Sequence, residues 1–170
     1  MNTKFKGLGV AMITPFNADG SIDLVGLEKL TLHLINGGVN YLVVMGTTGE
    51  NPTISAEEQA QVLTKVKEVN AKRLPIVFGI GGNNTAEVVN RLKTVDLTGV
   101  DGILSVSPYY NKPSQEGIYQ HYKAISENTP LPVIMYNVPG RTGSLISAAT
   151  TLRIAQLPNI VATKEASGSL

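Results

Sequence analysis

Short runs of apolar, mainly β-branched residues recur along this chain at intervals of about 30 residues. The runs are apolar throughout rather than alternating with polar residues, which is typical of strands covered on both faces, as in a parallel sheet. The interval is the length of one strand, its following helix and the return to the next strand. We therefore predict six parallel strands, at residues 8–13, 41–45, 75–80, 102–106, 132–136 and 160–164.

Amphipathic segments with helical spacing of their apolar residues fill the intervals between the predicted strands. Several have recognisable starts: Ser55 followed by Glu58 fits a capping box, and Thr85, Ser114 and Ser147 are expected N-caps. The predicted helices span residues 23–36, 56–72, 86–97, 115–128 and 148–156.

Repeated β/α units form either an open doubly wound sheet or a closed eight-stranded barrel. An open sheet gathers its ligand chemistry at one switch point, whereas a barrel draws on the carboxyl ends of many strands. Nearly every predicted strand here ends in polar, glycine-bearing or reactive residues, which favours the barrel. The fold class is thus α/β, and six strands correspond to the first six units of a (β/α)8 TIM barrel. We expect residues 1–170 to form a single catalytic barrel domain that lacks its last two units.

Composition and charge exclude several classes of function. The formal net charge is +1 with no cluster of Lys and Arg, so neither nucleic acid nor a membrane surface is an expected partner. No apolar run reaches membrane-spanning length, the first residues do not resemble a secretory signal, and a cytoplasmic location is expected. The chain has no cysteine, and His33 and His121 stand alone in predicted helices as surface or packing residues, so no metal site or cofactor is predicted.

Lys164 ends an apolar strand, where a lysine has two interpretations. Desolvation disfavours the ammonium and populates the free amine, which can attack a carbonyl and form a Schiff base. Alternatively, the side chain extends to water and has no chemical role. Tyr136 ends the preceding predicted strand, and paired strands lie about 4.8 Å apart, so its phenol could relay protons beside the amine. The alternative for Tyr136 is an aromatic residue that caps the barrel core.

Two further patterns offer groups that bind carboxylates. Thr47 and Thr48 lie between glycines after the second predicted strand, where their hydroxyls can donate hydrogen bonds, although a plain turn would look the same. Arg141 follows Tyr136 in a Pro-Gly-Arg-Thr-Gly loop and is suited to bidentate capture of a carboxylate. An exposed surface arginine is the alternative.

Four motifs in register resemble the dihydrodipicolinate synthase and N-acetylneuraminate lyase superfamily, from about residue 7 to the end of the chain. They are Gly46-Thr47-Thr48-Gly49-Glu50, Tyr109-Tyr110-Asn111, Tyr136-Asn137-Val138-Pro139-Gly140-Arg141-Thr142-Gly143 and Lys164-Glu165-Ala166. The two threonines and the Arg-Thr-Gly are more similar to the synthase branch than to the lyases.

The resemblance implies condensation of pyruvate with aspartate semialdehyde, in the pathway to diaminopimelate and lysine. Lys164 would hold pyruvate as an imine, Tyr136 would shuttle protons, and Thr47 would link it to Tyr110 from a neighbouring subunit. Arg141 and Thr48 would bind substrate carboxylates. The family also implies a homotetramer built as a dimer of dimers.

Two other functions stay open at this point. The chain could be another pyruvate-lysine aldolase, such as a sialic acid or sugar-acid lyase, or a catalytically silent piece of a barrel. The resemblance also implies weakened inhibition by lysine. Ala56 and Gln59 stand where lysine-inhibited members often carry histidines, although Asn83, Glu87 and Tyr109 keep the family's residue types.

Overall fold

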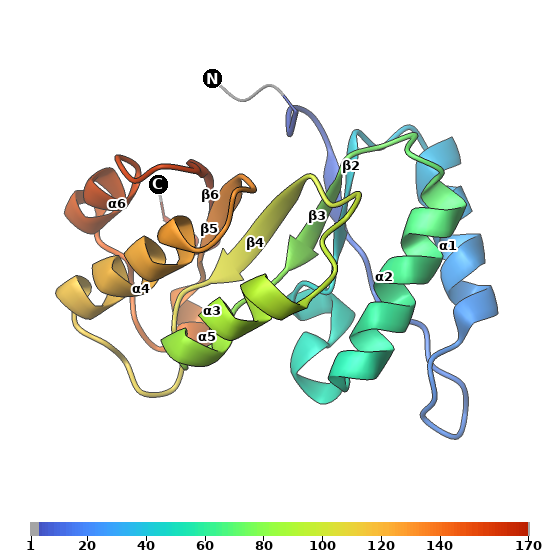
Figure 1. Cartoon of the computed structure of the whole chain (residues 1–170), viewed down its shortest axis with the longest axis horizontal. Coiled ribbons are helices and arrows are strands. Elements are labelled where there is room, and N and C mark those ends of the chain that lie inside the picture. Colours follow the sequence, from blue (N-terminus) through green and yellow to red (C-terminus); the bar gives the residue numbers. More distant parts are fainter. Residues whose placement is uncertain (1–3, 170) are drawn as a thin grey trace. The chain divides into compact units, whose positions relative to one another are not determined.

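The computed structural model describes residues 4–169, which alternate strands and helices along the chain (Figure 1). The chain divides into two compact units. The first contains the described residues up to Gly79 together with Asp96–Asp101, and the second contains Ile80–Val95 and the described residues from Gly102 onward. All the strand pairings described within each unit are parallel, as the continuous apolar runs predict.

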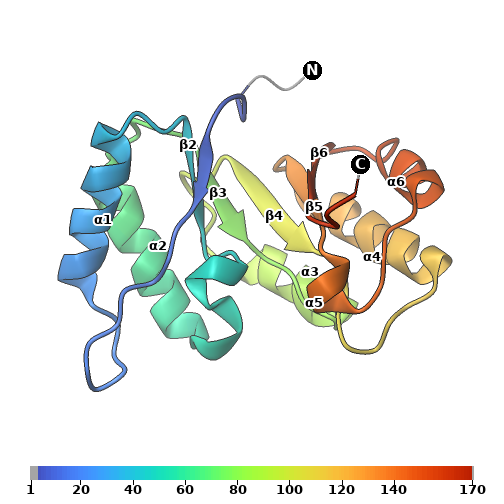
Figure 2. The same ribbon diagram turned by 180° about the vertical axis from the view of Figure 1, so that it is seen from behind.

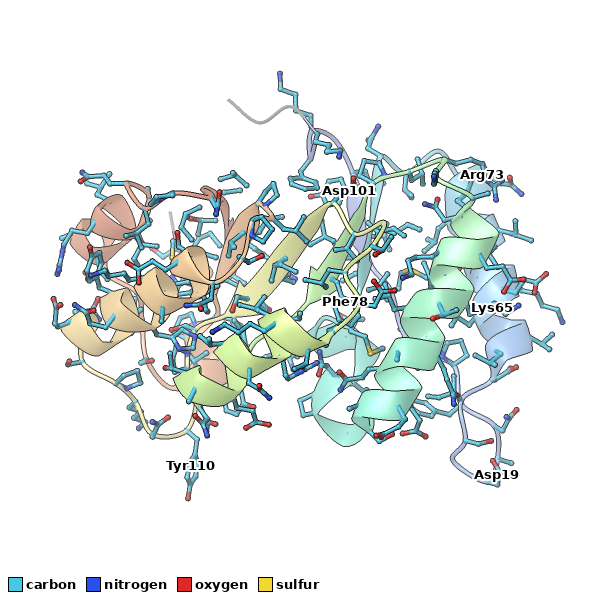
Figure 3. All side chains as sticks on the ribbon, in the orientation of Figure 1. Asp19, Lys65, Arg73, Phe78, Asp101 and Tyr110 are labelled. Atoms are coloured by element: carbon cyan, nitrogen blue, oxygen red, sulfur yellow. The ribbon has the colours of Figure 1, made fainter. Side chains whose placement is uncertain are left out.

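The first unit contains three parallel strands in the order β1-β2-β3. The second and third of these strands are buried: Leu42, Val44 and Val77 expose 1% of their surface or less. Phe78 also lies in this core, as Figure 3 shows. Helices α1 and α2 lie side by side in Figures 1 and 2, and an ion pair from Lys65 to Glu28 joins them at 3.2 Å. The elements are β1 (Gly9–Ala11), α1 (Leu24–Asn36), β2 (Tyr41–Val44), the 3-10 helices η1 (Thr47–Gly49) and η2 (Asn51–Thr53), α2 (Ala56–Asn70) and β3 (Ile76–Gly79).

The second unit contains three parallel strands in the order β4-β5-β6. Its core is formed by Ile103, Val133 and Met135 of the strands and by Ile118 and Ile125 of a covering helix, all fully buried. Figure 2 shows β5 and β6 side by side. The elements are α3 (Thr85–Thr94), β4 (Gly102–Val106), α4 (Gln115–Glu127), β5 (Val133–Asn137), α5 (Pro139–Thr142), α6 (Ala148–Ile154) and β6 (Ile160–Glu165).

The helix starts follow the sequence prediction with one correction. Ser55 and Glu58 form the expected capping box, and Ser114 and Ser147 are N-caps. The N-cap of α3 is Asn84 rather than Thr85, because the Asn84 side chain accepts a hydrogen bond from the backbone N–H of Glu87. Thr85 becomes the first helical residue.

No helix within residues 4–169 is both long enough and apolar enough to span a membrane. The same residues contain no group of three or more His, Asp or Glu side chains arranged to hold a metal ion. His33 is exposed on α1, whereas His121 is buried on α4 with 2% of its surface exposed.

Candidate active site at the carboxyl ends of β5 and β6

Lys164 and Tyr136 meet across the β5–β6 pair. The strands place the two residues directly opposite each other, and the Lys164 Nζ lies 4.3 Å from the centre of the Tyr136 ring. Tyr136 is buried with 6% of its surface exposed, whereas Lys164 is only partly buried. The structure therefore brings together the two residues that the sequence marks as amine and proton relay.

An irregularity in β6 sets this pairing. Val133 lies opposite Ile160, but the next residue of β5, Ile134, lies opposite Ala162, so that Val161 is an extra residue in β6. Side chains of a strand alternate between the two faces of the sheet, and one inserted residue exchanges the faces for everything that follows. The insertion places Lys164 on the same face as Tyr136.

The surroundings of Lys164 make its neutral amine easier to form than that of a solvated lysine. Burial lowers the pKa of the Lys164 ammonium, and the positive charge of Arg141 lowers this pKa further. A neutral amine is the form that attacks a carbonyl carbon. The contact with the Tyr136 ring acts in the opposite direction, since the face of an aromatic ring attracts a cation.

Arg141 lies in α5, a single helical turn directly after β5. Pro139 begins this turn, and Gly143 ends it with a positive φ of 72°. The guanidinium is exposed, and its charge affects the ammonium of Lys164. The charge of Arg141 thus acts on the amine, and the capture of a substrate carboxylate by Arg141 stays a prediction.

Thr47 and Thr48 lie in η1 of the first unit, and both are exposed. This loop is held by hydrogen bonds from Thr14 and Asn51, two residues for which the sequence predicted no role. Thr14 donates from its Oγ1 to the Gly49 carbonyl at 2.7 Å, and the Asn51 amide donates to the carbonyls of Met45 at 2.7 Å and Gly79 at 3.0 Å. The sequence gave only a weak indication of Thr14 and Asn51, because a polar residue just after a strand or a glycine-bearing turn is common.

Tyr110 differs from the other site residues in its exposure. It lies in the loop after β4 with 88% of its surface exposed, and its side chain extends away from the ribbon in Figure 3. Its φ is +72°, in the left-handed region that non-glycine residues seldom adopt. Four predicted site residues (Tyr110, Tyr136, Arg141 and Lys164) thus lie in the second unit, and the two threonines lie in the first.

Gln59, one of the two positions implicated in weakened lysine inhibition, points inward. It has 7% of its surface exposed, and its Nε2 donates to the Asn51 Oδ1 at 3.1 Å and to the Ile54 carbonyl at 2.9 Å. The neighbouring position, Ala56, is exposed at the start of α2. The side chain of Gln59 is engaged within its own unit, and weakened inhibition by lysine stays a prediction.

Parallel strands alternating with helices, and a partly buried lysine at the end of the sixth strand, define a class of protein: the β/α barrels that carry an amine at the carboxyl end of a strand. The chain belongs to the dihydrodipicolinate synthetase family, whose sequence profile matches residues 4–170.

Individual relatives agree with this family. The chain is 54% identical over 166 residues to the 4-hydroxy-tetrahydrodipicolinate synthase of Cytophaga hutchinsonii, covering 98% of this chain and 56% of that protein. It is 55% identical to the protein of the same name from Parabacteroides distasonis, covering 97% of this chain and 56% of that protein. The chain therefore spans a little over half the length of the curated relatives that it matches.

A solved structure confirms the fold class. The chloride-inhibited dihydrodipicolinate synthase of Acinetobacter baumannii, complexed with pyruvate, superimposes with a TM-score of 0.93 at 50% identity. The match covers 96% of this chain and 56% of that one. The six strands and their helices are the first six β/α units of a TIM barrel, as the sequence predicts.

Proposed function

We propose that the protein condenses pyruvate with aspartate semialdehyde to give 4-hydroxy-tetrahydrodipicolinate, through a Schiff base on Lys164. The observation that carries the proposal is the placement of a lysine of lowered pKa opposite a buried tyrosine, with Nζ 4.3 Å from the ring centre. The names of the relatives and the pyruvate bound to the Acinetobacter baumannii protein support the choice of substrates.

Each residue has a role in this reaction. The Lys164 amine attacks the keto carbon of pyruvate, and water leaves as the imine forms. Tyr136 moves protons to and from the nitrogen and the departing oxygen, and loss of a proton from the methyl group gives the enamine that attacks the aldehyde. Arg141 and Thr48 bind substrate carboxylates, and Thr47 connects Tyr136 to Tyr110. The protonated imine nitrogen accepts the electron pair that the methyl C–H bond leaves behind, so the reaction as proposed uses no metal or organic cofactor.

The exposure of Tyr110 supports a second copy of the chain as a partner. A side chain that is 88% exposed cannot relay protons in a desolvated site of its own unit, so we propose that it completes the site of a neighbouring subunit. We propose that two such dimers form a homotetramer. We also propose that each chain forms one catalytic barrel domain and that the protein lies in the cytoplasm.

The test is to trap the imine chemically. The protein is incubated with pyruvate and sodium borohydride, which reduces the imine to a stable secondary amine, and the adduct is located by peptide mass spectrometry. We expect one adduct, on the peptide that contains Lys164, and none in Lys164→Ala. Lys112→Ala, which removes another lysine of the second unit, should form the adduct as the parent does. An adduct on another lysine, or one that persists in Lys164→Ala, contradicts the proposal.

A further pyruvate-lysine aldolase activity is the second candidate, since imine formation alone does not select the acceptor aldehyde. Aspartate semialdehyde, compared with sugar-derived aldehydes as the second substrate, separates the two functions.

A further inference from the structure

Asn137 and Glu165 lie one position beyond the Tyr136–Lys164 pair, on the opposite face of the sheet. They are opposite each other in the register of β5 and β6, and the Asn137 Nδ2 donates to the Glu165 Oε2 at 2.8 Å. Asn137 is buried with 2% of its surface exposed, whereas Glu165 is exposed. Neither side chain contacts Lys164 or Tyr136 in the described interactions, so their role in the site is indirect.

Asn137 joins three segments of the second unit. Besides its bond to Glu165, its side-chain oxygen accepts the Ile146 N–H at 3.1 Å, which closes the loop that carries Arg141. Its backbone carbonyl accepts the Ala166 N–H at 2.9 Å, which continues the β5–β6 pairing past Lys164. One buried amide thus links the two strands and the α5 loop.

Because Val161 is inserted in β6, the register of β6 against β5 needs a specific interaction at this end of the strands. Continuing the Val133–Ile160 pairing without an inserted residue would place Lys164 opposite Asn137, on the wrong face, and Glu165 opposite Val138. Bulges between parallel strands are rare, and β6 has three exposed residues in succession, Val161, Ala162 and Thr163, which contribute little packing to fix its register. The Asn137–Glu165 and Asn137–Ala166 hydrogen bonds exist only in the shifted register.

We propose that the Asn137–Glu165 pair is a register lock that keeps Lys164 opposite Tyr136, which makes both residues positioning residues for the imine-forming amine. The carboxylate is suited to this role because its pKa is lowered, chiefly by the hydrogen bond from Asn137 and also by that from Ser167, so it stays ionised and accepts strongly. Glu165 directly follows Lys164 in β6, so its side chain lies on the opposite face of the sheet, away from the amine. This inference rests on the proposed imine chemistry of Lys164.

The first arm of the test measures register without any substrate. Hydrogen exchange of the Ala166 amide, which is bonded to Asn137, is compared with that of the Ser107 amide, which is bonded to Tyr136 at 3.0 Å between β4 and β5. In Glu165→Ala we expect Ala166 to exchange at least about tenfold faster while Ser107 is unchanged. Glu165→Gln retains an oxygen acceptor for Asn137 and should keep Ala166 protected.

A swapped pair provides a sharper control. Asn137→Asp places two carboxylates opposite each other and should speed hydrogen exchange of the Ala166 amide as Glu165→Ala does. Combining Asn137→Asp with Glu165→Gln restores one amide donor and one carboxylate with their positions exchanged, and the introduced carboxylate on β5 still offers an oxygen to the Ile146 N–H. We expect the double variant to recover the protection that the single variant loses.

The second arm measures the consequence for Lys164. The rate at which borohydride traps the pyruvate adduct is measured from about pH 6 to about pH 10. We expect Glu165→Ala to react at least about tenfold more slowly near neutral pH. The apparent pKa of the reacting amine should rise toward that of a solvated lysine, because the displaced side chain is no longer desolvated. A general loss of stability would not move this pH profile.

The outcomes separate the two proposals. If the parent protein forms no adduct on Lys164, the proposed function fails, while the exchange arm still decides the register lock. If the parent forms the adduct, and Glu165→Ala retains both Ala166 protection and the parent's pH profile, the register lock is wrong.

Discussion

His121 should make the second unit sensitive to acid. The imidazole is buried on α4 with 2% of its surface exposed, and its Nδ1 lies 2.8 Å from the Thr85 Oγ1 at the start of α3. The described residues offer no hydrogen-bond partner to its Nε2. Burial lowers the pKa of His121 to about 4. The folded protein therefore binds a proton at this site much more weakly than the unfolded chain does.

The sign and size of the effect follow from the two pKa values. An unfolded histidine titrates near 6.5, so the contribution of the neutral imidazole is intact above about pH 6.5. It declines as the pH falls below that value, and its loss is complete below the folded pKa of about 4. Between about pH 7.5 and pH 5, this one group should lower the free energy of unfolding by about 2 kcal/mol.

The perturbation is His121→Asn, which keeps a polar group near Thr85 but cannot be protonated. Urea unfolding followed by circular dichroism at pH 7.5, 6.5, 5.5 and 5.0 gives the free energy of unfolding for the parent and the variant. We expect the variant to be less stable at pH 7.5, because it fills less space, and to lose about 2 kcal/mol less than the parent on acidification to pH 5.

The control is His33→Asn, which removes the exposed histidine of α1 and should leave the pH dependence of the parent unchanged. Carboxylates also titrate in this range, but they are common to all three proteins and cancel in the comparison. A His121→Asn variant that loses as much stability between pH 7.5 and pH 5 as the parent would refute the assignment of His121 as a buried neutral group.

Three further changes test other parts of the structure. Lys164→Met should abolish pyruvate trapping yet leave the melting temperature at pH 6 at least as high as in the parent, because the lowered pKa of Lys164 means that folding disfavours its ammonium at every pH below the unfolded value. A clearly lower melting temperature would show that the contact with Tyr136 outweighs desolvation. Tyr122→Phe should lower the free energy of unfolding in urea by about 1 kcal/mol, since the buried Tyr122 hydroxyl donates to the Ser105 carbonyl at 2.9 Å. No change would mean that this hydrogen bond has no net value. Under the proposed function, Tyr110→Phe should lower turnover by about 10²-fold with little change in the Michaelis constant for pyruvate, because only the proposed proton relay is lost. Unchanged turnover would remove Tyr110 from the relay.

Local sequence was sufficient to predict the elements and the chemical groups at their ends. The continuous apolar runs of β2, β3, β4 and β5 are largely buried, and their spacing indicates parallel strands without knowledge of any contact. The capping box of Ser55 and Glu58 is a local interaction and could be predicted in the same way. Lys164 stood out because a charged side chain is unusual at the end of an apolar strand. These features depend on residues close together in the chain.

The way in which those groups face one another could not be predicted locally. The apolar run of β6 reads the same in either register, and the extra residue at Val161 that turns Lys164 toward Tyr136 is visible only in the pairing with β5. Thr85 and Asn84 are both good N-caps in sequence, but Thr85 pairs with His121, which lies 36 residues away. The two histidines look alike in sequence, yet one is exposed and the other buried. Register, partner choice and burial depend on distant segments, because a strand or a helix presents each side chain to whatever packs against it, and no local pattern contains that information.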